Sequence, residues 1–184
     1  EMYCQLKKKG VPVPNGFTVT ADAYNYFLKK SGIKGKILEI LKGTSKQNIP
    51  ARAKRIRELI LSSQLPADLS EEIIAAYKKL SAEFKTTHAD VAVRSSATAE
   101  DLPGASFAGQ QESFLNIKGE RALLDAVKKC FASLFTDRAV SYRIDQGFKH
   151  EKVSLSVGIQ KMVRSDLATS GVMFTVDTES GNNN

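Results

Sequence analysis

The stretch D-V-A-V-R-S-S-A-T-A-E-D-L-P-G-A-S-F-A-G-Q-Q-E-S-F, residues 90–114, guides the interpretation of the whole chain. It opens with a short apolar strand at residues 91–93. Arg94, two serines and a threonine follow in a loop rich in small residues. Small residues let a backbone approach a ligand, hydroxyls donate to anions, and arginine binds phosphate through two nitrogens. The stretch is therefore a candidate polyphosphate-binding loop, although its composition alone favours an ordinary polar surface loop.

The amino-acid composition and the net charge indicate a globular chain with a basic surface. Of its 184 residues, 42% are hydrophobic and 26% are charged, which suits one domain or one domain with a second lobe. The net charge is +7, from 27 Lys or Arg and 20 Asp or Glu. Such a balance fits nucleic acid, an anionic membrane or a polyanionic small ligand. Aromatic residues are not interleaved with the basic ones, so we expect no nucleic-acid partner.

The cysteines and the lack of export patterns indicate a cytoplasmic protein. Cys4 and Cys130 are isolated in sequence, which argues against a thiolate metal cluster and fits a reducing compartment. No apolar run approaches membrane-spanning length and no signal-peptide pattern is present, so no membrane partner is expected. The chain starts inside a predicted helix and ends on three asparagines. Both ends therefore predict a fragment of a longer protein.

The first half is predicted to be mainly helical. Two prolines and Asn-Gly at residues 11–16 form a rigid turn before a short strand at 17–19. The helices predicted after it are 21–30 capped by Thr20, 36–41, one capped by Asn48 and entered through Pro50, and one that begins at Ser70. Exposed positions from Lys29 to Arg57 are strongly basic. We interpret them as the solvated face of packed helices rather than as a surface that attracts polyanions.

Strands are predicted mainly in the second half. The expected elements are a strand at 111–117, a helix at 120–135, a helix at 138–146 capped by Asp137, a long strand at 153–163 and a strand at 171–176. The connection between the last two strands is short and polar, so we expect them to pair antiparallel. Helices in the first half and strands in the second predict an α+β fold rather than a doubly wound one.

Four phrases of the sequence resemble one enzyme family. They are V-R-S-S-A-T-A-E-D-L-P-x-A-S-F-A-G-Q-Q-E, G-V-P-V-P-N-G-F-T-V-T, S-L-F-T-D-R-A-V-S-Y-R and Q-K-M-V-R-S-D-L-A-T-S-G-V-M-F-T-V-D-T-E-S-G. The chain resembles the phosphoenolpyruvate synthase (pyruvate, water dikinase) family, whose relatives include pyruvate, phosphate dikinase and the rifampicin and glucan phosphotransferases. The last phrase is more similar to the synthases than to these relatives.

The resemblance implies part of an ATP-grasp-like nucleotide-binding domain at the N-terminus of a longer enzyme. Residues 1–184 would belong to that one domain, with a helical insert at about 29–86 and a strand-rich nucleotide-site part at about 90–181. The implied reaction converts ATP, pyruvate and water to phosphoenolpyruvate, AMP and phosphate. Its phosphohistidine and its pyruvate site would lie in other domains of the same protein, which are the implied partners besides ATP.

The resemblance also implies roles for individual residues. Arg94 and Arg138 would contact the ATP phosphates and act as catalytic residues. Ser95, Ser96 and Thr98 would either donate to phosphate or cap local turns. A loop over the phosphates would contain Gly104, Ala105, Ser106, Phe107, Ala108 and Gly109, and adenine would lie against Gln160, Lys161, Met162 and Val163. Met162 suits that surface because its side chain is polarizable and adaptable.

ATP and Mg²⁺ are the implied cofactors, with the metal ligands expected outside this chain. Asp177 and Glu179 share one face of a predicted strand, but the resemblance places the metal-binding acidic residues further downstream, so we interpret both as surface residues. The two histidines match no phosphohistidine motif. Arg143 is expected to form an ion pair with Asp137 or Asp145.

Two departures from the family leave alternatives open. The family's glycine-rich segment with its ATP-binding lysine and its downstream acidic residues are both missing from this sequence. We therefore predict that the chain alone has no synthase activity. The alternatives are a related rifampicin or glucan phosphotransferase, or a truncated, non-catalytic scaffold domain.

Overall fold

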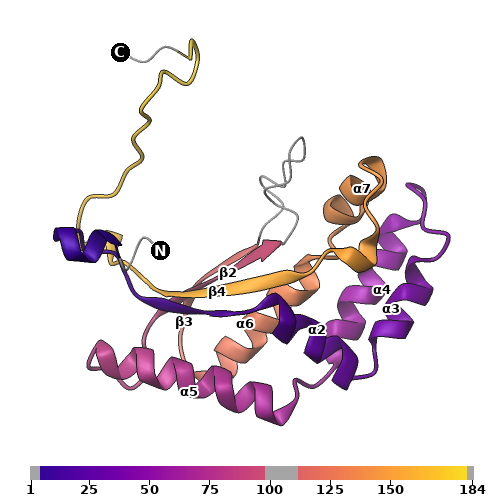
Figure 1. Cartoon of the computed structure of the whole chain (residues 1–184), viewed down its shortest axis with the longest axis horizontal. Helices are drawn as coiled ribbons and strands as arrows, with labels where there is room; N and C mark the ends of the chain where they lie inside the picture. The colour runs from indigo at the N-terminus through magenta and orange to yellow at the C-terminus, as the bar shows by residue number, and fades with distance from the viewer. Residues whose placement is uncertain (1–4, 98–111, 182–184) are drawn as a thin grey trace.

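Strands that are far apart in the sequence meet in one sheet, with helices against one of its faces (Figure 1). The computed structural model describes residues 5–97 and 112–181. Its elements are η1 (Lys7–Lys9), β1 (Gly16–Val19), α2 (Ala21–Lys30), α3 (Lys34–Leu41), α4 (Ile49–Ser62), α5 (Ala67–Glu83), β2 (Val91–Ala97), β3 (Ser113–Ile117), α6 (Glu120–Ser133), α7 (Asp137–Asp145), η2 (His150–Lys152), β4 (Leu155–Lys161) and η3 (Ser165–Leu167).

The sheet has the order β1-β4-β2-β3, and every neighbouring pair is antiparallel. β4 lies between β1 and β2, so the two longest strands form the centre. Arg94 lies opposite Gly158 in the β2–β4 register, and Thr18 lies opposite the same glycine in the β1–β4 register. Helices combined with an antiparallel sheet confirm the predicted α+β class, and this sheet is consistent with an ATP-grasp-like domain.

One face of the sheet is buried and the other is open. Val91 and Val93 of β2 and Val157 and Ile159 of β4 are buried under the helices. Because successive side chains alternate across a strand, the residues between them point the other way. Arg94 is exposed on that other face. Figure 1 shows α5 and α6 on the opposite side of the sheet from this open face.

The helices α3, α4 and α5 pack into the same hydrophobic core as the buried face of the sheet. Ile56 and Ile60 of α4 are fully buried in the same cluster as the sheet valines. Phe131 of α6 stacks on Phe27 of α2, with ring centroids 5.5 Å apart. Buried Tyr77 of α5 donates its hydroxyl to the carbonyl oxygen of Ala89 (2.7 Å), and the Tyr77 hydroxyl oxygen accepts from the backbone N–H of Gly119 (3.0 Å). This hydroxyl therefore ties α5 to the starts of β2 and α6.

The predicted helices are present, but the start or the cap of several of them differs from the prediction. Thr20 caps α2 as predicted, by accepting from the backbone nitrogen of Ala23 at 3.3 Å. α7 is capped by Thr136 rather than Asp137, whose carboxylate pairs with Arg57. The side chain of Asn48 does not cap α4 but bonds to the backbone of Ser45 and Gly43. α5 begins at Ala67 rather than Ser70, because Pro66 already supplies the break and Asp68 the acidic first turn.

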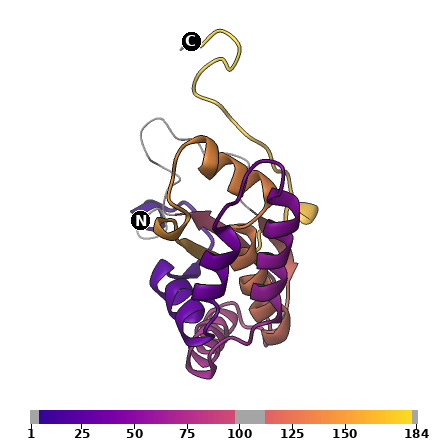
Figure 2. The same cartoon turned by 90° about the vertical axis from the view of Figure 1, so that its right-hand side faces the viewer.

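The predicted strand at residues 171–176 is wrong. These residues form no strand, and the side chains of Val172 and Met173 are 86% and 90% exposed. The expected partner was the strand ending near residue 163, but β4 already has β1 on one side and β2 on the other. A strand has only two edges, so the last segment cannot join it. Figures 1 and 2 show this segment leading away from the helices and the sheet.

Candidate functional site

Arg94 stands near the middle of the open sheet face. The prediction placed it in a loop after a strand that ends at Val93, but β2 continues to Ala97. The strand is longer because Ser95 and Ala97 keep the alternation and pair with Val157 and Leu155 of β4. Arg94 is thus fixed by backbone pairing on both sides, while its guanidinium stays exposed. A charged group held on a rigid strand is well placed to bind an anionic ligand.

The surroundings of Arg94 are small, flat and polar. Gly158, directly opposite, adds no side chain, and a methyl group built there would meet only the Arg94 carbonyl oxygen, at 3.9 Å. Ser96 and Ser156 pair further along the same face. A shallow depression of about 300 Å³ is lined by Val13, Pro14, Asn15, Gly16, Phe17, Thr18, Arg94, Gly158, Ile159 and Gln160. The face therefore leaves open space beside the guanidinium.

Of the residues proposed to hold adenine, Gln160 lies in the same depression as Arg94. Its side-chain nitrogen donates to the carbonyl oxygen of Pro14 at 3.2 Å. Lys161 alternates to the other face, where its ammonium lies 5.8 Å from the ring centre of Phe84. Met162 donates its backbone N–H to Asp90 (2.9 Å), and Val163 is exposed just beyond the end of β4. The four residues thus span the end of β4 rather than forming one surface.

The two serines after Arg94 point in opposite directions. Ser95 is only 5% exposed, on the helix side, and its hydroxyl oxygen accepts from the backbone nitrogen of Glu112 at 2.9 Å. Ser96 is exposed on the face of Arg94, and its carbonyl oxygen accepts from the Ser156 hydroxyl. The structure therefore brings Ser96, and not Ser95, to the face of Arg94. Thr98, Gly104, Ala105, Ser106, Phe107, Ala108 and Gly109 lie outside the described residues.

Arg138 lies in a second depression, of about 590 Å³, at the start of α7. The residues that line it are Arg57, Leu61, Glu112, Phe114, Lys129, Ala132, Ser133, Thr136, Asp137 and Arg138. None of them lines the depression at Arg94, so the two candidate catalytic arginines occupy different pockets. Glu112 connects them indirectly, because it lines the second depression and bonds to Ser95, the residue after Arg94.

Some neighbours of these arginines were not identified from the sequence. Thr18 and Gly158 line the same depression as Arg94, and Arg57 and Lys129 line the same depression as Arg138. Arg57 donates both to the Phe135 carbonyl (2.7 Å) and to the Asp137 carboxylate (2.8 Å). The proximity of each depends on pairing between segments distant in sequence. The alternation of β4 was the one available signal, since it places Gly158 and Gln160 on one face.

Arg143 is buried instead of ion-paired as expected. Asp137 pairs with Arg57 and Asp145 pairs with Lys46. The Nε of Arg143 donates to Nδ1 of His150 at 3.0 Å, while its two terminal nitrogens have no hydrogen-bond partner among the described residues. Burial lowers the pKa of Arg143 to about 10. Burial, and secondly the charge of Arg143, lower the pKa of His150 to about 4.

The described residues hold no group of three or more His, Cys, Asp or Glu that could bind a metal ion. Asp177 instead accepts backbone hydrogen bonds from Glu179 (2.7 Å) and Ser180 (3.0 Å), which lower the pKa of its carboxyl group. No helix in the part of the chain that the structure describes is both long and apolar enough to cross a membrane.

Comparison with known proteins places the chain in a family. Residues 1–184 match the family described as the pyruvate phosphate dikinase AMP/ATP-binding domain. The chain belongs to this family. It is also 54% identical, over 98% of its length, to phosphoenolpyruvate synthases of Helicobacter pylori, Aquifex aeolicus and Escherichia coli. It spans 23%, 22% and 23% of those proteins, respectively, so it corresponds to less than a quarter of each. The family resemblance predicted from the four sequence phrases is confirmed.

Proposed function

We propose that the open sheet face around Arg94 binds the polyphosphate of ATP, as part of the nucleotide-binding domain of a phosphoenolpyruvate synthase. The observation that carries the proposal is the exposed guanidinium of Arg94 opposite a glycine, on a face of small polar residues. Membership of an AMP/ATP-binding family supports it. Arginine binds phosphate oxygens in bidentate fashion, and small neighbours let the ligand come close.

The remaining site residues are arranged around this centre in the proposal. Ser96 shares the face of Arg94 and donates to phosphate, whereas Ser95 holds Glu112 and so positions the chain where it returns to the sheet. Adenine binds where β4 ends, beside Gln160 and Lys161 of the strand and Met162 and Val163 just after it. Arg138 supplies a second positive charge from the start of α7. Thr98 and residues 104–109 complete the phosphate contacts.

The proposed reaction of the whole protein converts ATP, pyruvate and water to phosphoenolpyruvate, AMP and phosphate, through a phosphohistidine in another domain. This chain positions the polyphosphate and counters its charge with arginine. Mg²⁺, when bound, neutralises phosphate charge, and we expect its ligands outside this chain because Asp177 is already engaged. A cytoplasmic location is part of the same proposal. The names of the relatives favour a synthase over a rifampicin or glucan phosphotransferase.

The proposal is tested by titrating the chain with ATP and Mg²⁺ while amide shifts are followed by NMR. We expect the largest shifts at residues 13–18, 92–96 and 158–163. Arg94→Ala removes a charge-assisted contact worth about 1.5–3 kcal/mol, so the dissociation constant should rise by at least about tenfold. Arg94→Lys keeps the charge without the bidentate geometry. Its dissociation constant for ATP should lie between those of the unchanged chain and Arg94→Ala.

The matched control is Arg121→Ala, which removes an exposed arginine from α6. It should leave ATP affinity unchanged. If Arg94→Ala binds ATP as well as the unchanged chain does, Arg94 does not contact the nucleotide. If the folded chain binds no ATP at all, the scaffold alternative replaces the proposed site.

A further inference from the structure

The positive charge of the chain is concentrated in one segment. Residues 29–57 contain ten Lys or Arg and a single acidic residue, Glu39, which gives a net charge of +9. The whole chain carries +7, so all the other residues together carry −2. Most of this segment forms α3 and α4, labelled in Figure 1, and neither helix contributes a residue to the depression at Arg94. The excess charge is therefore not explained by the proposed nucleotide site.

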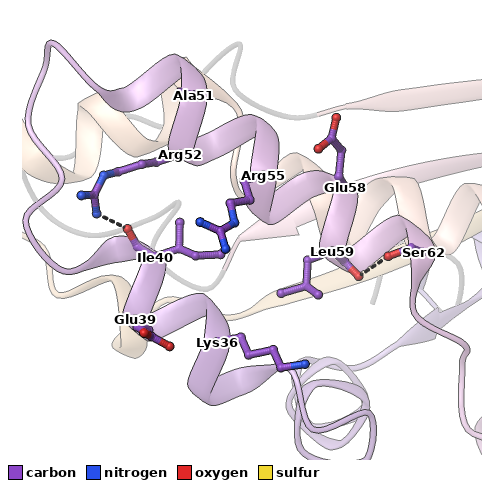
Figure 3. A pocket seen from close by; sticks show the side chains of 9 residues that line it. All are labelled: Lys36, Glu39, Ile40, Ala51, Arg52, Arg55, Glu58, Leu59 and Ser62. Atoms are coloured by element: carbon purple, nitrogen blue, oxygen red, sulfur yellow. Dashed lines mark hydrogen bonds between the residues drawn. The ribbon is translucent and has the colours of Figure 1, made fainter.

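A groove runs between α3 and α4 in this basic segment. Its volume is about 910 Å³, and it is lined by Lys36, Glu39, Ile40, Ala51, Arg52, Arg55, Glu58, Leu59 and Ser62 (Figure 3). Ile40 and Leu59 are half-buried and form an apolar floor that continues the core. Lys36 and Arg55 are exposed at its rim. The groove combines an apolar strip with charged edges, where Glu39 and Glu58 lie beside the two basic side chains, and it shares no residue with either depression described above.

The basic residues of this segment fall into two classes. Some are used within the fold: Arg52 donates to the carbonyl oxygens of Ile40 and Lys42 at the end of α3, and Lys46 pairs with Asp145. By contrast, Lys36 and Arg55 have no hydrogen-bond or ion-pair partner within residues 5–97 and 112–181. Exposed charges next to an apolar floor are available to a partner of opposite charge.

We propose that the α3–α4 groove is a docking surface for an acidic amphipathic helix of another protein. Two neighbouring helices form a trough of the kind that takes a third helix by its apolar face. An apolar side chain of the partner lies between Ile40 and Leu59, and its carboxylates face Lys36 and Arg55. Glu39 and Glu58 also line the groove, and they repel a continuous polyanion such as nucleic acid. A partner with separate acidic positions avoids these two carboxylates.

The test uses the 184-residue chain and a fluorescein-labelled helical peptide of about four turns, with leucines on one face and glutamates on the other. Binding is measured by fluorescence anisotropy at low salt. We expect saturable binding with a dissociation constant of order 10 μM, weakened severalfold at high salt because the charges are exposed. Replacing the leucines of the peptide by serine should abolish binding, since the apolar floor then has no partner.

The paired variant is Lys36→Glu with Arg55→Glu, which should raise the dissociation constant by at least about tenfold, because two attractions become repulsions. Its matched control is Lys79→Glu with Arg121→Glu, an equal change of charge on exposed positions of α5 and α6. The control should change binding less than about twofold. Both variants should unfold at the same urea concentration as the unchanged chain, which separates docking from folding.

Three outcomes would overturn the proposal. One is the absence of saturable peptide binding. Another is an equal loss of binding in both charge-reversed variants, which would mean that only net charge matters. The third is tighter binding of an oligothymidine or of phosphatidylserine vesicles than of the peptide, with the same dependence on Lys36 and Arg55. That result would assign the groove to nucleic acid or to a membrane surface instead.

Discussion

On the helix side of β2 and β4 the side chains are branched, apolar and buried, whereas on the open side they are small and polar around one charge. Val93 and Ile159 represent the first face, and Arg94 and Gly158 the second. The same strands form both faces, so backbone pairing that holds the core also fixes Arg94. If the open face binds the ligand as proposed, stability and binding depend on alternate residues of one strand, and each should be changeable without the other.

Two arginines show the same contrast between an exposed and a buried position. Arg94 is exposed on the open face, where its charge is solvated and available to a ligand. Arg143 of α7 is fully buried, with Nε bonded to His150 and its guanidinium 5.6 Å from the ring centre of Phe135. Desolvation disfavours the charged form of the buried group only. The buried arginine should therefore affect stability, and the exposed one should affect binding.

The largest effect on the fold is expected where β1 approaches β4. A methyl group on Gly16 would lie 2.2 Å from the Ile159 carbonyl oxygen and 2.9 Å from the Gln160 Cα. Both are backbone atoms, so the strands must separate, and Gly16→Ala should lower the free energy of unfolding by about 1–3 kcal/mol. Urea unfolding measures this loss.

Gly158→Ala is the counterpart of Gly16→Ala at a position with free space for a methyl group. Its added methyl group meets nothing closer than 3.9 Å, so stability should change by less than about 0.5 kcal/mol. The methyl group lies beside Arg94, however, and should weaken ATP binding. Equal destabilisation by the two alanines would contradict the difference in free space at the two glycines.

A smaller effect is expected at the two serines. Ser95→Ala leaves the backbone nitrogen of Glu112 without its acceptor, and should cost about 1 kcal/mol of stability. Ser96→Ala changes an exposed position and should cost less than about 0.5 kcal/mol, while it weakens ATP binding. Urea unfolding gives the free energy of unfolding of each variant, and ATP titration gives its dissociation constant. A loss of affinity with Ser95→Ala and none with Ser96→Ala would reverse the assignment of the faces.

The fold class and most elements were predictable because they depend on local patterns. Thr20 starts α2 and the apolar face of α6 is regular, so both could be identified from their own residues. The start of α7 was misplaced by one residue, because Thr136 and Asp137 are both good caps and only the distant Arg57 engages Asp137.

The candidate site was predictable in residue type but not in geometry. Arg94 and Gln160 were identified from sequence phrases, and the structure places them in one depression. That Ser95 faces the helices follows from the extension of β2 to Ala97, which requires the pairing with β4. The error at residues 171–176 has the same origin. An alternating segment forms a strand only if an edge is free, and the edges of β4 are taken by β1 and β2, which are more than 50 residues away in the sequence.

The smallest effect concerns the buried pair of Arg143 and His150, and it depends on pH. The folded protein lowers the pKa of His150 to about 4, from 6.5 in an unfolded chain. Between these values the unfolded chain binds the proton and the folded one does not, so acid favours unfolding. Stability from this group is therefore complete above about pH 6.5 and falls as the pH drops towards 4. Because His150 is only half-buried, solvent screens the effect.

His150→Asn tests whether His150 contributes to the pH dependence of stability, since asparagine keeps an acceptor for Arg143 but does not titrate. Urea unfolding of this variant should depend less on pH between 4 and 6.5 than unfolding of the unchanged chain. His88→Asn, which removes the histidine that stacks on Tyr77, controls for the loss of a ring contact. ATP affinity should follow the same pH dependence in both variants, because neither histidine lines the depression at Arg94. If His150→Asn altered ATP affinity at constant stability, the two faces would be coupled through α7, the helix that carries both Arg143 and Arg138.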